Sequence, residues 1–501
     1  MPAPFQLSQD DAIMLAAMVT GDRTFLSHSL RVGFERTGSF HMLVVSGFHL
    51  AIVSGCIFWV AKRLRLPRVP ATLLTIFASF AYALFTGFAT PVQRSLWMVT
   101  LYLLGRLVYR DRSPMNTIGF AALCLLVASP HSLFDSGFQM TLLAVVAIGG
   151  IASPLLQATI HPYLTATRDL RLIVIDVKLP PLVAQFRVTM RLIAAKLAAA
   201  FNRFVGWRAF PWMVRAALRV MELVVVACVV ELAMTLPMAI YFHRITIFAL
   251  PVNMLILPLL LVLMPAALLT LIALVVWPAA AWLPAAAVAL LLHFGLRLVH
   301  LFGSFALGDF RIPGPLPWQS ALFCALLGAA IVLARGEKWQ RRAAWGALIC
   351  AAVAAVAPRP VQHPRDALLV EAIDVGQGDS LLLIAPDGKT LLVDGGGFAG
   401  GPRPASHYSD EEQSAGTSGP QEFDIGEEVV SPALWSRGIR RLDVVALSHA
   451  HSDHMGGLPA VLRNFHPAEL WVGNNPHTES YDTLLREAAD LDVRIRSLRA
   501  G

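Results

Sequence analysis

Four side chains that bind divalent cations lie within six residues of one another, at His449, His451, Asp453 and His454, directly after the apolar run 442–447. Imidazole nitrogens suit zinc, manganese or iron, and the carboxylate beside them can hold a second ion. A bound cation lowers the pKa of water to about 7, which provides a nucleophile at neutral pH. The motif therefore predicts a hydrolytic centre with divalent metal, zinc or manganese, in which Asp453 is also the candidate catalytic residue.

The domain that positions these ligands is expected at residues 367–501, after a linker at 358–366. The predicted strands are 368–373, 380–384, 390–393, 442–447 and 469–472, and the predicted helices are 429–435 and 458–464. Alternating strands and helices predict an α/β domain. Residues 395–422, rich in glycine, serine, proline and acidic residues, are predicted to form a loop.

Within this domain, His449 and His451 are two residues apart, so the ligands are expected to converge from a loop rather than from a helix face. Asp379 and Asp394 are expected to be structural turn residues whose carboxylates accept backbone N–H bonds.

The rest of the chain is too apolar to be a soluble globule, because apolar residues make up 56% and charged residues only 15% of the sequence. A helix needs about 20 apolar residues to cross a bilayer. Ten candidate spans follow from this length: 40–61, 71–88, 92–108, 116–128, 137–156, 220–242, 245–277, 281–302, 320–334 and 343–357. Residues 40–357 are therefore predicted to form a polytopic α-helical membrane bundle, preceded by an N-terminal segment at 1–39. The long segment 245–277 contains three prolines and can be a kinked span, a re-entrant pair or two helices.

The net charge of +7 is concentrated in a few stretches, which include Lys62 to Arg65 and Arg335 to Arg342. With ten spans, the basic stretches fall on one side, which the positive-inside rule makes cytoplasmic and which leaves the metal domain outside. The basic, amphipathic insert 157–219 is expected to lie on an anionic membrane surface. Contact with nucleic acid is the alternative for this insert.

Polar residues inside the membrane are expensive and are functional candidates by default. The candidates for a channel lumen are His49, Arg94, Gln139 and Asn253. Asp135 flanks the Gly137-Phe138 pair near Gln139, and His293, Arg297 and His300 share one helical face. Capping, snorkelling and helix–helix hydrogen bonds are the local alternatives, and they are favoured for the last three residues.

Taken in order, these segments resemble the ComEC/Rec2 family of DNA-uptake channels. The matching stretches are TGSFHMLVVSGFH at 37–49, TGFATPVQRS at 86–95, SGFQMT at 136–141, LPMAI at 236–240 and DVGQGDS at 374–380. The motif at 449–454 is similar to the first metal motif of the metallo-β-lactamase superfamily. By that resemblance, His449 and His451 would ligate one ion, and Asp453 and His454 a second.

The resemblance implies an inner (plasma) membrane channel for single-stranded DNA in natural transformation, with a metal-dependent nuclease domain. It also implies partners: membrane lipids, a DNA receptor, and a cytoplasmic helicase or single-strand-binding protein. The family's N-terminal OB-like module has no counterpart here, and neither His466 nor His477 has the context of the later metal ligands. We therefore expect an incomplete chain or a non-catalytic protein, of open oligomeric state.

Two other functions agree with the same residues. One is a membrane-anchored metallohydrolase that acts on an envelope lipid or small metabolite. The other is a channel whose metal domain is purely structural.

Overall fold

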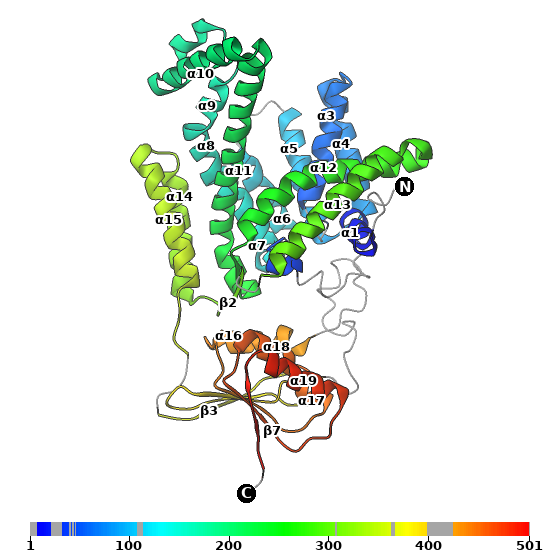
Figure 1. Cartoon of the computed structure of the whole chain (residues 1–501), viewed down its shortest axis with the longest axis vertical. Coiled ribbons are helices and arrows are strands. Elements are labelled where there is room, and N and C mark those ends of the chain that lie inside the picture. The colour runs from blue at the N-terminus through cyan, green and yellow to red at the C-terminus, as the bar shows by residue number, and fades with distance from the viewer. Residues whose placement is uncertain are drawn as a thin grey trace.

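The protein is described here from a computed structural model, which covers residues 8–21, 33–39, 42, 45, 47–107, 114–305, 308–361, 366–397 and 424–499. Most of the predicted loop 395–422 lies outside these ranges, as do residues 40, 41, 43, 44 and 46 of the first predicted span. Two bodies are visible: a helical bundle, and a sheet domain below one end of it (Figure 1).

Within the described ranges, each of the ten predicted spans contains a helix. They are α3 (Gly47–Arg63), α4 (Arg68–Phe85), α5 (Thr90–Leu107), α6 (Pro114–Ala128), α7 (Ser136–Ala147), α11 (Phe210–Pro237), α12 (Ala249–Val276), α13 (Trp282–Gly303), α14 (Pro317–Leu333) and α15 (Lys338–Val356). In the part of the chain that the structure describes, five helical stretches are long and apolar enough to cross a membrane: Arg68–Phe85, Ser136–Thr159, Val205–Phe242, Ala249–Val276 and Trp282–Gly303. The polytopic helical body is thus confirmed, whereas ten crossings remain a prediction.

Residues 249–276 of the predicted span 245–277 form one continuous helix, α12, with Pro258 and Pro265 inside it, whereas residues 245 and 246 lie in a short strand, Arg244–Thr246. Each of these prolines removes one backbone hydrogen bond without ending the helix. Of the three possibilities for this segment, a single helix is therefore the one that forms.

The basic insert folds into α9 (His161–Ala166), η5 (Ile173–Lys178), α10 (Pro181–Ala200) and η6 (Val205–Ala209). α10 lies at the end of the bundle farthest from the sheet domain (Figure 1). α11 continues η6 without a break, so one helical stretch runs from Val205 to Phe242 and begins well before the predicted span at 220. Residues 210–219 therefore belong to the long helix rather than to the insert.

The C-terminal domain contains a six-stranded sheet in the order β3-β4-β5-β6-β7-β8 among the described residues. Its strands are β3 (Leu369–Ala372), β4 (Leu381–Ile384), β5 (Thr390–Val393), β6 (Val444–Leu447), β7 (Glu469–Val472) and β8 (Arg494–Ser497). β3, β4 and β5 pair antiparallel, and β5 to β8 pair parallel. The first five strands were predicted, whereas β8 was not.

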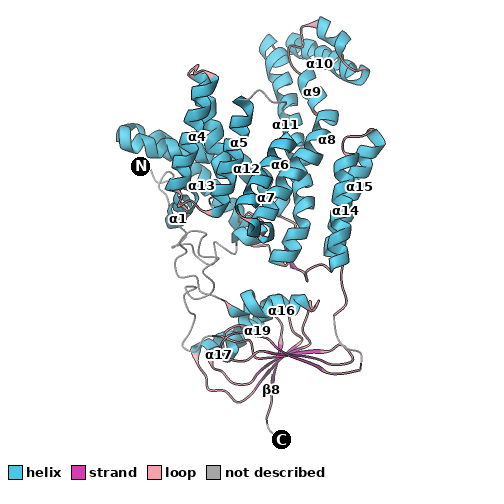
Figure 2. Ribbon diagram, turned by 180° about the vertical axis from the view of Figure 1, so that it is seen from behind, coloured by secondary structure: helices cyan, strands magenta, loops and turns pink. Residues whose placement is uncertain are grey.

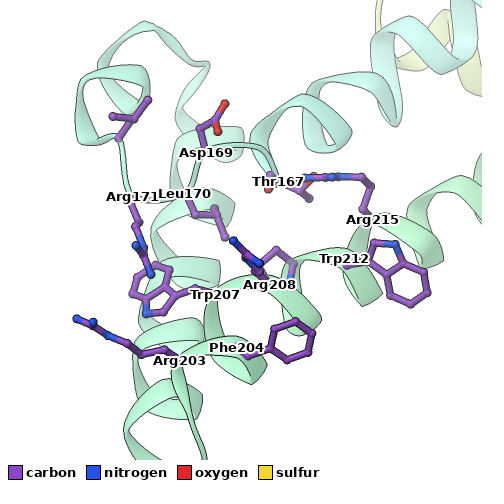
Figure 3. Close-up of a pocket in the computed structure, with 12 residues that line it drawn as sticks. Thr167, Asp169, Leu170, Arg171, Arg203, Phe204, Trp207, Arg208, Trp212 and Arg215 are labelled. Atoms are coloured by element: carbon purple, nitrogen blue, oxygen red, sulfur yellow. Dashed lines mark hydrogen bonds between the residues drawn. The ribbon is translucent and has the colours of Figure 1, made fainter.

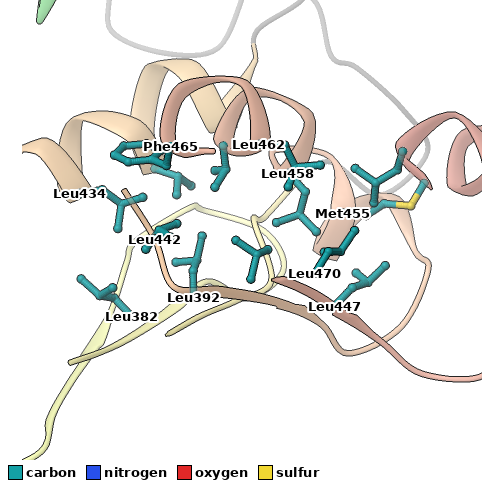
Figure 4. Close-up of a cluster of buried hydrophobic side chains, with 14 of the residues drawn as sticks. Leu382, Leu392, Leu434, Leu442, Leu447, Met455, Leu458, Leu462, Phe465 and Leu470 are labelled. Atoms are coloured by element: carbon teal, nitrogen blue, oxygen red, sulfur yellow. The ribbon is translucent and has the colours of Figure 1, made fainter. Parts of the chain in front are cut away.

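Helices cover the face of this sheet that is turned towards the bundle (Figures 1 and 2). They are η10 (Gly426–Val430), α16 (Ser431–Ser436), α17 (Ser452–Met455), α18 (Leu458–Phe465) and α19 (Glu479–Asp490). α18 buries Leu458, Val461, Leu462 and Phe465, which recur at the spacing of one helix face. These side chains pack on Leu392 and other strand residues (Figure 4).

The two bodies meet at a small sheet formed by β1 (Arg244–Thr246) and β2 (Asp309–Arg311), in which Arg244 lies directly opposite Arg311. Like charges at this position repel. Arg311 Nη2 lies 2.5 Å from Glu427 Oε1 in η10, and Arg244 Nη1 lies 3.3 Å from Glu35 Oε2. Each arginine therefore has a carboxylate partner.

Aromatic stacking reinforces this junction. The His243 ring, which precedes β1, stacks on Trp435 of α16 with ring centroids 4.9 Å apart. Arg359 in the linker donates a hydrogen bond to the carbonyl of Trp435. The metal domain is therefore attached to the end of the bundle at which α12 begins.

Burial raises the pKa of Glu427, but the charge of Arg311 and the hydrogen bond from Asn464 outweigh burial and hold that pKa below its ordinary value. A depressed carboxylate pKa contributes stability that is present above the ordinary value and is lost as the pH falls through the folded value. The junction should therefore be intact at neutral pH and weaken in acid.

The substitution Glu427→Gln is expected to weaken the junction by about 1.5–3 kcal/mol, because it removes the charged partner of Arg311. The protection of amide hydrogens in β1, β2 and α16 against exchange should fall in this variant at neutral pH. In the wild type it should fall below the ordinary pKa range of glutamate, when each rate is compared with the intrinsic exchange rate at the same pH, which itself slows in acid. Glu479→Gln, at an exposed site on α19, serves as the control. Unchanged exchange in Glu427→Gln, or an equal change in the control, would contradict this account of the junction.

Candidate metal centre and polar cluster

The metal motif lies where the parallel strands β5 and β6 end, with Asp394 directly after β5 and Ser448 directly after β6. The carboxyl ends of parallel strands meet at one edge of a sheet, which is where such proteins place their sites. The DVGQGDS turn packs against this edge. Gly378 there has φ +76°, and a Cβ on it would lie only 1.6 Å from the Asp453 carbonyl oxygen. Glycine is therefore required at this position.

The three predicted histidine ligands do come together. The ring centroids of His449 and His451 are 4.6 Å apart, and those of His449 and His454 are 4.0 Å apart. The carboxylate oxygen Oδ2 of Asp453 lies 3.8 Å from His454 Nε2. His449 and His451 are on a loop, as predicted, but Asp453 and His454 are on the short helix α17.

Asp394 has a larger role than the predicted turn residue. It is buried, with φ +61°, and its carboxylate accepts the Ser448 backbone N–H at 2.8 Å and the Ser448 hydroxyl at 2.6 Å. The same carboxylate lies 2.9 Å from Nδ1 of His454. A carboxylate on one ring nitrogen fixes the orientation of the other, so His454 Nε2 is presented to Asp453.

Asp379, the other predicted turn carboxylate, is exposed, and it is its backbone carbonyl that accepts the Gly396 N–H at 3.0 Å. The side chain of Asp374 holds the turn instead, because it accepts the Gly376 N–H. The structural role of this turn therefore rests on Asp374 and on glycine.

The donor types and the Asp394–His454 contact fit a divalent cation. Within the described ranges, however, no three His, Cys, Asp or Glu side chains are grouped closely enough to hold one. His466 ends α18 with an exposed side chain, and His477 Nδ1 lies 2.8 Å from Asp482 on the surface. The assignment of His449, His451, Asp453 and His454 as ligands therefore stays a prediction.

In the helical body, Arg94 of α5 is 6% exposed, and its Nη1 lies 2.6 Å from Asp135 Oδ2. The other carboxylate oxygen of Asp135 accepts the Gly137 N–H at 2.7 Å and so caps α7. A Cβ on Gly137 would lie 2.7 Å from Arg94 Nη2, so the SGF sequence leaves room for the guanidinium. A buried charge requires such a partner.

The other lumen candidates, Gln139, His49 and Asn253, lie near the starts of α7, α3 and α12. Gln139 Oε1 accepts the Tyr241 hydroxyl at 2.7 Å, and its amide donates to the Leu133 carbonyl. His49 is fully buried in the first turn of α3, and Asn253 Oδ1 is buried without a hydrogen-bond partner among the described residues.

We call His49, Arg94, Asp135, Gln139 and Asn253 the polar cluster. All five lie at the starts of α3, α5, α7 and α12. These starts share a side of the bundle, because a Cβ on Gly47 would meet the Ser95 hydroxyl, and Tyr241 joins α7 to the chain just before β1. The polar cluster therefore lies at the end of the bundle that carries the metal domain.

One contact of a buried carboxylate with a partly exposed histidine was not predicted from the sequence. Asp11, in helix α1 (Gln9–Thr20), is fully buried, and its Oδ2 lies 3.2 Å from His293 Nε2. The capping box that Asp11 forms with Ser8 was the available signal in the sequence. Arg297 and His300 are exposed and take no part in this contact.

Comparison with known proteins now decides the family. Residues 18–337 match the family model described as Competence protein, and residues 373–494 match the Metallo-beta-lactamase superfamily. The chain belongs to the ComEC/Rec2 family of competence proteins. The second match also supports the use of divalent metal in this ComEC-family chain.

Three curated relatives illustrate the match. ComE operon protein 3 of Bacillus subtilis is 24% identical over 500 residues, which cover 99% of this chain and 55% of the relative. Competence protein ComA of Neisseria gonorrhoeae is 34% identical over 97 residues, 18% of this chain and 14% of the relative. Recombination protein 2 of Haemophilus influenzae is 24% identical over 123 residues, which cover 22% of this chain and 16% of the relative. The chain thus spans about half the length of the first relative, and no solved structure matches it.

The substitution Asp394→Asn is expected to lower the affinity for zinc or manganese by about 10–100-fold, because the amide no longer fixes His454 as the carboxylate does. Calorimetric titration of the metal-free protein measures this. Asp387→Asn, in the exposed β4–β5 turn, should bind as the wild type does. Equal affinities for wild type and Asp394→Asn would refute the role of Asp394.

Proposed function

We propose that this ComEC-family protein is a channel in the bacterial inner (plasma) membrane that takes up single-stranded DNA during natural transformation. Its metal domain would hydrolyse the strand that does not enter. The observation that carries this proposal is the polar cluster at the end of the bundle that bears the metal domain. Its His49 and Arg94 are buried, and Asp135, Gln139 and Asn253 are partly buried.

A polyanion that crosses lipid needs a polar and partly cationic path. Arg94 supplies a guanidinium whose Nε is buried without a hydrogen-bond partner among the described residues. The N-termini of α3, α5, α7 and α12 add partial positive charge, since the helix dipole is positive at that end. Both features favour a phosphate backbone at this end of the bundle.

Orientation in the membrane follows from charge. The basic α3–α4 and α14–α15 turns, with Arg63 and Arg335, lie at the end opposite the metal domain (Figure 1). The positive-inside rule makes that end cytoplasmic. The metal domain and the polar cluster would then face outside, where a DNA receptor would deliver the substrate. A helicase or single-strand-binding protein would receive the strand in the cytoplasm.

For the hydrolytic step, His449, His451, Asp453 and His454 would hold divalent metal, zinc or manganese and two ions in all. The metal would supply a nucleophile and neutralise charge that develops on the phosphate. The chain's own contribution is orientation, because Asp394 fixes both Ser448 and His454. The junction at Glu427 would hold the metal domain at the end of the bundle where the polar cluster lies.

The substitution Arg94→Ala is expected to lower transformation by about tenfold or more, because it removes the buried cation of the polar cluster. Transformation would be counted in a competent host that lacks its own protein of this family, with the membrane level of the variant measured by immunoblot. Arg106→Ala, at the other end of α5, is the matched control. Normal transformation by a well-inserted Arg94→Ala variant would refute the assignment.

The substitution His451→Ala is expected to abolish metal-dependent cleavage of single-stranded DNA by the purified protein, because it removes a ligand, whereas His477→Ala should leave cleavage intact. Cleavage of lipid or small phosphodiesters without cleavage of DNA would favour the membrane-anchored metallohydrolase instead. Absence of both metal and hydrolysis would indicate a structural metal domain.

A further inference from the structure

A basic pocket lies within the insert, between the loop 167–172 and the start of α11 (Figure 3). It has a volume of about 650 Å³. Four arginines line it, Arg171, Arg203, Arg208 and Arg215, together with Trp207 and a single carboxylate, Asp169. The lining is therefore strongly cationic.

The loop that forms one wall of this pocket is held rigidly. Arg187 of α10 is fully buried, and it donates hydrogen bonds to the carbonyls of Ala166 at 2.7 Å and Leu172 at 3.2 Å. It also pairs with Asp176 at 2.7 Å, as does Arg191. The wall is thus formed before any ligand arrives, which reduces the entropy lost on binding.

The arginines that line the pocket are largely unneutralised. Arg171, Arg203 and Arg208 form no ion pair with a carboxylate in the described part of the chain, and Arg171 instead lies over the Trp207 ring, 4.9 Å from its centroid. Arg215 donates to the Thr167 carbonyl and hydroxyl. Guanidinium groups so arranged repel one another, and their forks match the oxygens of a phosphate group.

Exposed apolar side chains line the pocket and also follow its loop along the chain, in η5 and at the start of α10. Val174, Val177 and Leu182 are 76%, 87% and 69% exposed, and Phe204 and Trp212 are 63% and 69% exposed. Exposed aliphatic chains beside arginine and tryptophan are typical of a surface that lies in the headgroup region of a membrane. The exposed rings of Phe204 and Trp212 can stack on nucleic-acid bases. Val174, Val177 and Leu182 offer a base no such surface, so it is this aliphatic part that favours a lipid over a DNA strand.

We propose that this pocket binds the phosphate headgroup of an anionic phospholipid, with the rim side chains inserted among the acyl chains. The pocket lies at the same end of the bundle as the basic α3–α4 turn, opposite the metal domain. A bound lipid would fix the depth of α10 and of the first turns of α11 in the membrane. This proposal does not depend on DNA uptake.

The test uses the purified full-length protein in zwitterionic detergent, titrated with short-chain phosphatidylglycerol, phosphatidylcholine or a thymidine oligomer. Native mass spectrometry measures bound lipid. The double variant Arg203→Ala, Arg208→Ala should bind phosphatidylglycerol about tenfold more weakly than the wild type. Binding of phosphatidylcholine should be weak in both proteins.

The matched control is the double variant Arg341→Ala, Arg342→Ala, which removes two arginines of α15 outside the pocket and should bind phosphatidylglycerol as the wild type does. The double variant Arg203→Lys, Arg208→Lys keeps the charge but loses the planar, forked guanidinium groups. Its affinity for phosphatidylglycerol should lie between those of the wild type and the alanine variant. This measurement tests the proposal if the alanine variant does not fold. Equal losses in the pocket and control variants, or no loss in the pocket variants, would overturn the proposal. So would tighter binding of the thymidine oligomer than of phosphatidylglycerol, lost in the pocket variant.

Discussion

Two arginines face each other across the β1–β2 sheet, and this arrangement is stable only because carboxylates from other parts of the chain neutralise both. Glu427 is one of them, and it comes from the metal domain. The repulsion between Arg244 and Arg311 thus becomes a reason for the two bodies to associate. Because β1 leads directly into α12, the same contact determines which end of the bundle the metal domain covers.

The polar cluster at that end is hard to explain by stability alone. Burying a charge costs stability even when it is paired, so the buried guanidinium of Arg94, whose partner Asp135 is 39% exposed, is weak evidence of a structural role. Asp135 also caps α7, and Gln139 connects that helix to Tyr241. Tyr241 lies just before β1, so these contacts place the proposed lumen at the end of the bundle to which the metal domain is attached.

Hydropathy and strand patterns predicted the helical segments and five strands well, because each depends on a run of neighbouring residues. The β1–β2 pairing had no such signal, since its strands are three residues long and far apart in sequence. Asp394 looked like a turn residue because its bonds to Ser448 and His454 exist only when β5 and β6 lie side by side. Arg187 likewise looked like a membrane-surface residue, although it is buried against backbone carbonyls. In contrast, α19 had a signal in its buried Tyr481, Leu484 and Ala488, which was overlooked.

The central claim is that DNA passes through the polar cluster. A photoactivatable amino acid at position 139 tests it directly, in competent cells that are taking up labelled DNA. We expect crosslinks to single-stranded DNA from position 139 and none from position 77, where Phe77 is exposed on the outer surface of α4. Crosslinks from position 77 but not from position 139, while transformation proceeds, would contradict the account.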